Sequence, residues 1–386
     1  MGRRVARPTD QRGFSIIELL IAVAIGGAGI AAASYVAKMA VRGAGRGSQV
    51  SQAVLSTQVI ARQMRSDLEL AGFGSTGAVG ADPSFAAAMV NPTARPAGMG
   101  TGRNALPVIR GIDNAAGLTI GGVPVLQGSD IVQVIVPDPG RASTTVQRVP
   151  VGTRCNAIVL NFLQPGANVG ACTVAYVSDH TGANGAGRTQ LLRCGATDDP
   201  LLFDIAPGAD LMCARWSTYW VDNRFQLHRS DLDPALGTLS LMGGLLHVPA
   251  GGGALDVIAP GVVDLQVAYR LSSAAGPTTV ATSWAYDEVS PTLIAGAQWF
   301  EVRQARVNLL FRTLRAVDDQ ANGQDMPVME NRPAGGALSL PTVISAIRVN
   351  GTSHAYRFVR MTTSQVLHNQ RFFDLNLPTG VPADPY

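Results

Sequence analysis

Hydrophobic and polar positions set the first part of the chain apart from the rest. From Leu19 to Ala37, nineteen residues carry no charge, and the apolar stretch around them extends from Phe14 to Val41. As a helix, these 28 residues would span about 42 Å at 1.5 Å per residue, more than the ~30 Å hydrocarbon core of a membrane. The pattern predicts a membrane-spanning helix over residues 14–41.

A second helical pattern follows. The segment RGAGRGS after Val41 predicts a break or weak point, and helical spacing resumes at Ser48. Apolar residues then recur three, four or seven positions apart and define one stripe. Gly72 and Gly74 are expected to end the helix. We therefore expect a helix over 14–72 whose second half docks on a sheet through Val50, Val54, Ala61, Met64, Leu68 and Ala71.

The remainder, residues 73–386, indicates a β-rich body. Segments 74–116 and 273–290 are rich in small and turn-forming residues and are expected to be long loops. No alternation of strands and helices is visible, so the expected fold class is α+β: a long N-terminal helix packed on a large antiparallel sheet. A helical start at 299–310 is left open. The predicted strands are 118–122, 130–136, 156–163, 172–178, 217–223, 224–230, 261–271, 301–313 and 355–367.

The net charge of +3 is concentrated at the N-terminus. Residues 1–13 hold four arginines against Asp10 alone, which gives +3, and leave 30 − 4 = 26 basic and 27 − 1 = 26 acidic side chains elsewhere. The positive-inside rule keeps the arginine-bearing end in the cytoplasm and places the body outside it. The balanced body offers no excess of positive charge for nucleic acid, and none is expected as a partner.

Glu18 is the anomaly in the apolar stretch. A carboxylate within a membrane helix costs roughly 2.5–3.5 kcal/mol on insertion scales, so it usually has a partner. A plain signal anchor gives no reason for Glu18. A secretory signal is cleaved after its apolar region, whereas here the small Gly13 precedes it.

The octamer GFSIIELL, Gly13 to Leu20, resembles the signature of type IV prepilins. The resemblance implies that a prepilin peptidase cuts after Gly13 and methylates the new amino terminus, Phe14. It also implies that Glu18 pairs with the α-amine of a neighbouring subunit and fixes its register. The helix would first anchor the subunit in the bacterial inner membrane and then pack in the centre of a filament.

Glycines replace the prolines that are common in this helix of major pilins. No proline occurs between Phe14 and Leu70, and Gly26, Gly27 and Gly29 lie in the middle of the apolar stretch. One hypothesis is that the helix loosens here on assembly, since glycine weakens a helix by about 1 kcal/mol relative to alanine. The alternative is close helix packing in lipid through small residues.

Later blocks resemble the PilW-type minor pilins, in the same order along most of the chain. The ending differs, because Gln370-Arg371 stands where an Arg-Asn pair is usual. The resemblance implies a non-enzymatic minor pilin that primes pilus assembly at or near the tip, with other minor pilins, the major pilin and a tip adhesin, and that supports adhesion and twitching motility on the cell surface. A J-like minor pseudopilin of a type II secretion system is the alternative. The blocks are 62–74, 217–231, 262–271, 299–312 and 355–371.

The four cysteines predict two disulfides if the body is exported. Cys155, Cys172, Cys194 and Cys213 are 17, 22 and 19 residues apart, which does not fit the spacing of CxxC metal sites. Three pairings are possible. We favour Cys155–Cys172 with Cys194–Cys213, because each closes a short, hairpin-sized loop; free buried thiols are the alternative.

Other catalytic and cofactor patterns are missing from the sequence. The five histidines form no HxxxH or HxH pair, and no GxSxG or Walker motif occurs, since the only lysine is Lys38. Oxygen ligands near 318–325 could suggest calcium, but their spacing is not that of an EF-hand, and a solvated turn is favoured. We therefore expect no cofactor and no metal. The oxygen-bearing residues are Asp318, Asp319, Asn322 and Asp325.

Overall fold

The computed structural model describes only part of the chain, which divides into two compact units, residues 1–52 and residues 53–386. The described ranges are 15–72, 79–81, 104–106, 108–115, 117–145, 147–159, 161, 172, 174–179, 188–195, 198–232, 240–242, 245–247, 254–273, 276–280, 302–313, 346–349, 352–355 and 358–366.

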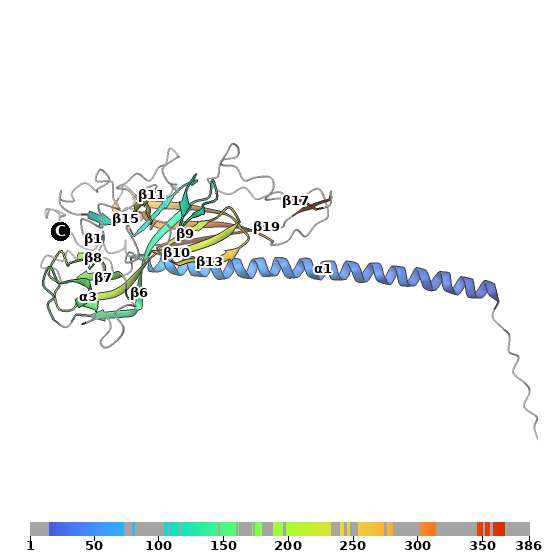
Figure 1. Ribbon diagram of the computed structural model, residues 1–386, viewed down its shortest axis with the longest axis horizontal. Coiled ribbons are helices and arrows are strands. Elements are labelled where there is room, and N and C mark those ends of the chain that lie inside the picture. Colours follow the sequence, from blue (N-terminus) through green and yellow to red (C-terminus); the bar gives the residue numbers. More distant parts are fainter. Residues whose placement is uncertain are drawn as a thin grey trace, which may run out of the picture. The chain divides into compact units, whose positions relative to one another are not determined.

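Helix α1 begins at Ile16 and continues without interruption to Leu70, so that it contributes to both units (Figure 1). The predicted break at RGAGRGS is wrong. Gly43, Gly45 and Gly47 lie inside the helix, and a Cβ built at each would meet no neighbouring atom within 4 Å. Glycine lowers helix stability by about 1 kcal/mol, but it keeps the backbone N–H that proline would remove.

Among the described residues, α1 is the one helix long and apolar enough to cross a membrane. Its most apolar window of 18 residues has a mean hydropathy of 2.2, and none of that window is buried. The exposed large side chains of this part include Ile16, Ile25, Ile30 and Val36. A helix that is apolar all round and uncovered by its own chain needs lipid or other subunits around it.

In the second unit, the last turns of α1 dock on the sheets as the stripe of apolar residues predicts. Met64, Leu68 and Ala71 are buried, while Leu55 is largely exposed. The helix ends at Leu70, and Gly72 follows in a left-handed conformation with φ of 63°. Its N–H donates to the Ile135 carbonyl at 3.0 Å, which joins the end of the helix directly to a strand.

The larger sheet has nine strands in the order β13-β10-β9-β7-β8-β1-β2, with β6 paired to β9 and β3 paired to β6. All pairs are antiparallel except β1 with β8. Figure 1 labels most of these strands. They are β1 Val79–Ala81, β2 Asn104–Leu106, β3 Ile109–Ile112, β6 Ile131–Thr144, β7 Val174–Asp179, β8 Arg188–Arg193, β9 Asp210–Val221, β10 Gln226–Leu232 and β13 Ala254–Pro260.

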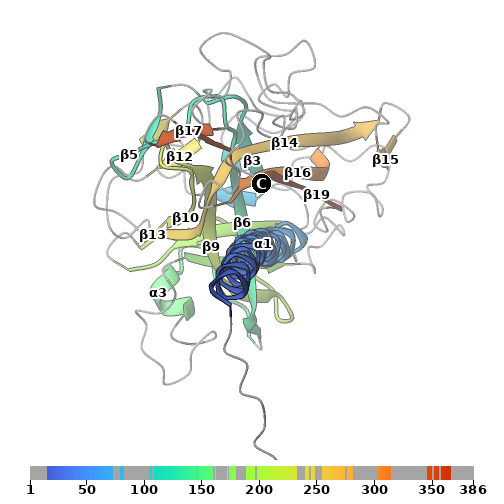
Figure 2. The same ribbon diagram turned by 90° about the vertical axis from the view of Figure 1, so that its right-hand side faces the viewer.

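A second sheet of four antiparallel strands has the order β15-β14-β16-β19 (Figure 2). Its strands are β14 Val262–Ser273, β15 Gly276–Val280, β16 Val302–Arg312 and β19 Phe358–Val366. Three two-stranded ribbons complete the described strands: β4 Thr119–Ile120 with β5 Val123–Pro124, β11 Ser240–Met242 with β12 Leu245–His247, and β17 Ala346–Val349 with β18 Thr352–Ala355.

The main core lies where α1, the larger sheet and the second sheet meet. Met64 and Leu68 of the helix belong to one buried cluster with Val134 of β6, Leu265 of β14 and Leu309 of β16. Alternation along β14 and β16 aims one face of each strand into this cluster. The α+β fold class is therefore confirmed, with helix against antiparallel sheet, and the open alternative of a helical start before β16 is resolved for 302–312 in favour of a strand.

Residues 145–209 form an insertion between the paired strands β6 and β9. The ends of the insertion are tied together, since Thr145 N–H donates to the Ala209 carbonyl at 2.9 Å and Gly208 N–H donates to the Thr145 carbonyl at 2.7 Å. Together with residues of β9, the insertion builds a separate buried cluster that contains all four cysteines. A compact unit with adjacent ends interrupts a hairpin without disturbing its register.

Two expectations for the body are corrected. The predicted strand at 156–163 is wrong at its start, because Cys155–Ile158 forms the short helix α3. The N–H of Asn156 donates to the Asp198 carboxylate at 2.8 Å, so a tertiary contact at the helix start outweighs the β-propensity of the sequence. The expectation of loops over 74–116 and 273–290 is wrong in part, because β1, β2 and β3 lie in the first range and β15 in the second.

Candidate functional site

A hydrogen-bonded cap closes the N-terminus of α1 around Glu18. The N–H of Ser15 donates to Glu18 Oε2 at 3.1 Å, and the N–H of Ile17 donates to Ser15 Oγ at 3.3 Å. The N–H of Leu19 donates to the Ser15 carbonyl at 3.0 Å, which makes Ser15 the capping residue. This reciprocal arrangement is a capping box, in which two otherwise unsatisfied N–H groups of the first turn find acceptors.

The capping box places the Glu18 carboxylate at the end of the helix where the expected new amino terminus lies. The sequence analysis assigns Glu18 a partner only in another subunit and misses this local role, although the pattern Ser-x-x-Glu was available to reveal it. Gly13 and Phe14, the expected cleavage and methylation positions, lie outside the described residues. Phe14 is the residue directly before Ser15 in the sequence, so cleavage would create its α-amine one residue away from the cap.

The middle of the apolar stretch contains helix without local packing. A Cβ built at Gly26, Gly27 or Gly29 would meet nothing within 4 Å in this chain. The backbone around them is helical throughout. Both hypotheses for these glycines, loosening on assembly and close packing against other helices, therefore remain predictions.

A polar contact joins the other end of α1 to the body. Asp67 has a side chain only 3% exposed, and its carboxylate accepts hydrogen bonds from the Arg215 guanidinium and the Tyr219 hydroxyl of β9. Burial, followed by the charge of Asp67, raises the pKa of Tyr219 above its ordinary value of 10.0. Tyr219 therefore stays a hydrogen-bond donor at neutral and moderately alkaline pH. A buried carboxylate with two donors fixes the helix to one position on the strand.

The four cysteines form two disulfides, but the favoured pairing is wrong. Cys155 is bonded to Cys194 and Cys172 to Cys213, with Cα–Cα distances of 5.1 and 5.6 Å. The reason is the strand order: β7 follows Cys172 and pairs with the start of β9, so that the partners Ala175 and Cys213 lie opposite each other. Sequence spacing favours local loops, whereas the pairing of the strands joins cysteines 39 and 41 residues apart.

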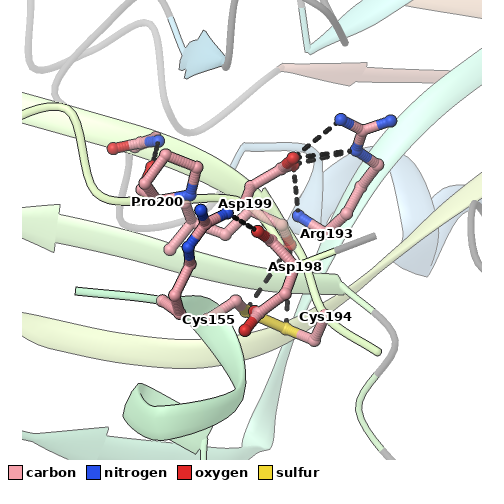
Figure 3. Close-up of polar contacts among 9 residues, drawn as sticks. Cys155, Arg193, Cys194, Asp198, Asp199 and Pro200 are labelled. Carbon is pink, nitrogen blue, oxygen red and sulfur yellow. Dashed lines mark hydrogen bonds and ion pairs between the residues drawn. A yellow bond between two sulfur atoms is a disulfide. The ribbon is translucent and has the colours of Figure 1, made fainter. Parts of the chain in front are cut away.

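Charged groups hold the segment that follows Cys194 (Figure 3). Asp199 receives a two-pronged ion pair from Arg193, with the shortest distance of 2.7 Å from Nη2 to Oδ1, and both side chains are largely buried. Next to it, Asp198 caps α3 through Asn156. The first disulfide and these two carboxylates connect α3, β8 and the loop between them, so this cluster supports structure and presents no reacting group.

The described histidine with the most developed contacts is a brace for a hairpin. His228 of β10 is stacked on Trp220 with ring centroids 4.4 Å apart, and its Nε2 lies 2.9 Å from Asp222 Oδ2. Asp222 Oδ1 also accepts the backbone N–H groups of Arg224 and Gln226, which close the turn between β9 and β10. Within the described residues, no group of three or more His, Cys, Asp or Glu side chains is arranged to hold a metal ion. The candidate calcium residues between 318 and 325 lie outside the described residues.

Comparison with known proteins identifies the N-terminal segment. Residues 8–34 match the family described as the prokaryotic N-terminal methylation motif. No curated protein and no solved structure matches the chain. The matched range includes the expected cleavage position, the capping box and the first five turns of α1. Together with the long apolar helix and the antiparallel body, the motif supports a type IV pilin-like protein, a pilin or a pseudopilin, that is processed by a prepilin peptidase, is anchored in a membrane and assembles with other pilins.

Proposed function

We propose that this chain is a minor pilin of the PilW type, which helps to initiate type IV pilus assembly at or near the tip of the fibre. The observation that carries the proposal is the methylation motif at 8–34 on a helix that continues for 55 residues into a large two-sheet body. The PilW assignment has further support in the order of the sequence blocks around α1, β9, β14, β16 and β19.

The size of the body favours a terminal position. Residues 73–386 amount to about 315 residues, more than the usual single domain. Repeated packing of such a body along a thin fibre would crowd its neighbours, whereas one copy at the end meets no copy beyond it. The insertion 145–209 adds to this bulk in the described part of the body.

The role that we propose is mechanical, and the subunit is not an enzyme. Load on the helix passes to β9 through Asp67, Arg215 and Tyr219 and to both sheets through the apolar core. Partners of the subunit would be other minor pilins, the major pilin and a tip adhesin, with consequences for adhesion and twitching motility. The chain would reside in the inner membrane before assembly and on the cell surface afterwards.

Mass spectrometry of the mature N-terminus tests the class. We expect a chain that begins at Phe14 and carries a methyl group on its α-amine. An intact leader in the native host, or removal of the whole apolar helix, would contradict the proposal, because the first would leave no free amine and the second no anchor.

Immunogold labelling of isolated fibres tests the position. We expect single particles at fibre ends. Regular labelling along the shaft would overturn the terminal placement but leave the pilin class intact. Deletion of the coding sequence separates the alternative, a J-like minor pseudopilin: loss of surface fibres and twitching supports the pilus, whereas loss of protein secretion with normal fibres supports the secretion system.

A further inference from the structure

Basic residues recur on α1 directly after the apolar stretch. Lys38 ends the run of nineteen uncharged residues, Arg42 follows four positions later, and the sequence places Arg46 four positions after that. Residues four apart lie on the same side of a helix, one turn above another. The helix carries no acidic residue between Glu18 and Asp67, so α1 itself supplies no carboxylate near these cations.

The position of Lys38 and Arg42 matches the edge of a bilayer. The nineteen uncharged residues cover about 29 Å at 1.5 Å per residue, close to the ~30 Å thickness of the hydrocarbon core. Lys38 then lies at the boundary and Arg42 about 6 Å beyond it, within the headgroup layer. Both residues are exposed within the first unit, on an uninterrupted helix. Long basic side chains at this depth extend toward phosphate groups.

We propose that Lys38 and Arg42 bind the phosphate groups of anionic phospholipids at the outer face of the membrane in which α1 is inserted. The inference rests on the membrane insertion that the pilin-like class implies. The ligand is a phosphodiester with a net negative charge, for which a cation on a flexible stem is a general partner. Electrostatic attraction of this kind contributes about 1 kcal/mol per basic residue, or about fivefold in association for each.

Removal of the leader gives this pair a specific role. Before cleavage, four arginines of residues 1–13 mark the cytoplasmic end of the helix. After cleavage before Phe14, that end keeps only the new α-amine and Glu18, which neutralise each other. Lys38 and Arg42 then carry the charge that holds the processed helix in the bilayer. They therefore set its depth until a filament takes the helix up.

Electron spin resonance of labelled lipids tests the proposal on the full chain. The chain is reconstituted in vesicles of dioleoylphosphatidylcholine that contain a trace of spin-labelled phosphatidylglycerol or spin-labelled phosphatidylcholine. Lipids in contact with the helix give a motionally restricted spectrum, and its share yields their relative association. We expect phosphatidylglycerol to be favoured by roughly fivefold or more at low salt. The preference should approach one in 1 M NaCl, where the Debye length is about 3 Å.

Matched variants assign the effect to the pair. Lys38→Gln with Arg42→Gln should remove the preference, while Arg62→Gln with Arg65→Gln, which changes the same charge further along α1, should leave it intact. A restricted spectrum without any preference for phosphatidylglycerol would overturn the proposal and leave the pilin assignment standing, and would favour carboxylates of neighbouring subunits as the partners. Absence of any restricted lipid would overturn the membrane insertion on which both ideas rest.

Discussion

The carboxylate of Asp67, near the end of α1, accepts a hydrogen bond from the hydroxyl of Tyr219 in the middle of β9. Arg215, four residues earlier on the same strand, donates to the other oxygen of Asp67. Tyr219 is 1% exposed and Asp67 2%. Two donors on a single buried acceptor give the helix a polar fixed point within an otherwise apolar interface, so a slide of one turn would leave a charge buried without a partner.

Tyr219→Phe should lower the stability of the body without changing its shape. The variant removes one hydrogen bond to a charged group and leaves Asp67 with Arg215 alone, which predicts a loss of about 1.5–3 kcal/mol. Urea unfolding of the full chain in a mild detergent, followed by near-ultraviolet circular dichroism, measures the change. Glu69→Gln is the matched control, because the exposed Arg65–Glu69 pair contributes about 0.5 kcal/mol or less. Equal losses in the two variants would contradict the role of Asp67.

Substitutions in the capping box should separate the charge of Glu18 from its hydrogen bond. Glu18→Gln keeps an acceptor for the Ser15 N–H but removes the charge, whereas Ser15→Ala removes the acceptor for Ile17 and keeps the charge. If register in the filament depends on the charge, Glu18→Gln should assemble as poorly as Glu18→Ala. Ser15→Ala should assemble nearly normally, with a cost of about 0.5–2 kcal/mol confined to the first turn.

Incorporation into purified fibres, quantified by immunoblot against the amount of processed subunit, measures this difference. Comparison with processed subunit is necessary because a defect in cleavage would also reduce assembly. Normal incorporation of Glu18→Gln together with failure of Ser15→Ala would show that the cap, and not the pair with an α-amine, is the essential feature.

The parts of the fold that local patterns determine could be predicted from the sequence. The apolar stretch and the stripe with Met64 and Leu68 announce α1 and its docked face, and β-branched runs announce β14 and β16. The interruption expected at Gly43–Gly47 was not found, because nothing in that segment removes a backbone donor. The pairing of Cys172 with Cys213 depends on which strand β7 joins, and Asp67 finds its partners 148 and 152 residues away. Such contacts leave no local pattern.

Tryptic digestion without reduction should distinguish the disulfide pairings directly. Trypsin cuts after arginine and leaves Cys155 and Cys172 together in the peptide 155–188, and Cys194 and Cys213 together in 194–215. The observed pairs Cys155–Cys194 and Cys172–Cys213 join these two peptides into one species. The local pairing would release two separate peptides with internal bonds. Further cleavage at Phe162 and before Asp198 should then yield Cys155 linked to Cys194, which excludes the third pairing.

Loss of both disulfides should destabilise the insertion more than the remainder of the body. Each closes a loop of about 40 residues, for which the chain-entropy estimate is about 4 kcal/mol. The two loops overlap, so the double loss should be smaller than the sum of the single losses. Hydrogen exchange of Cys155→Ser with Cys194→Ser should show faster exchange in β7 and β8 than in β14 and β16. Uniform acceleration across both sheets would indicate that the insertion unfolds with the entire body.

The stability of the body should fall as pH rises through the titration of Asp130. Burial, followed by the charge of Asp113, raises the pKa of Asp130 well above its ordinary value of 3.8. The folded state therefore binds a proton that the unfolded state releases, and linkage requires stability to decrease between the ordinary and the raised pKa and to level off above the latter. Asp130 accepts the N–H of Asn114 at 2.8 Å and that of Val267 at 2.6 Å. Asp130→Asn loses one of these bonds at every pH but does not titrate. Urea unfolding from pH 4 upward should thus show the wild type well above the variant in acid, with the gap narrowing as pH rises; a constant gap would mean that Asp130 does not change its protonation state on folding.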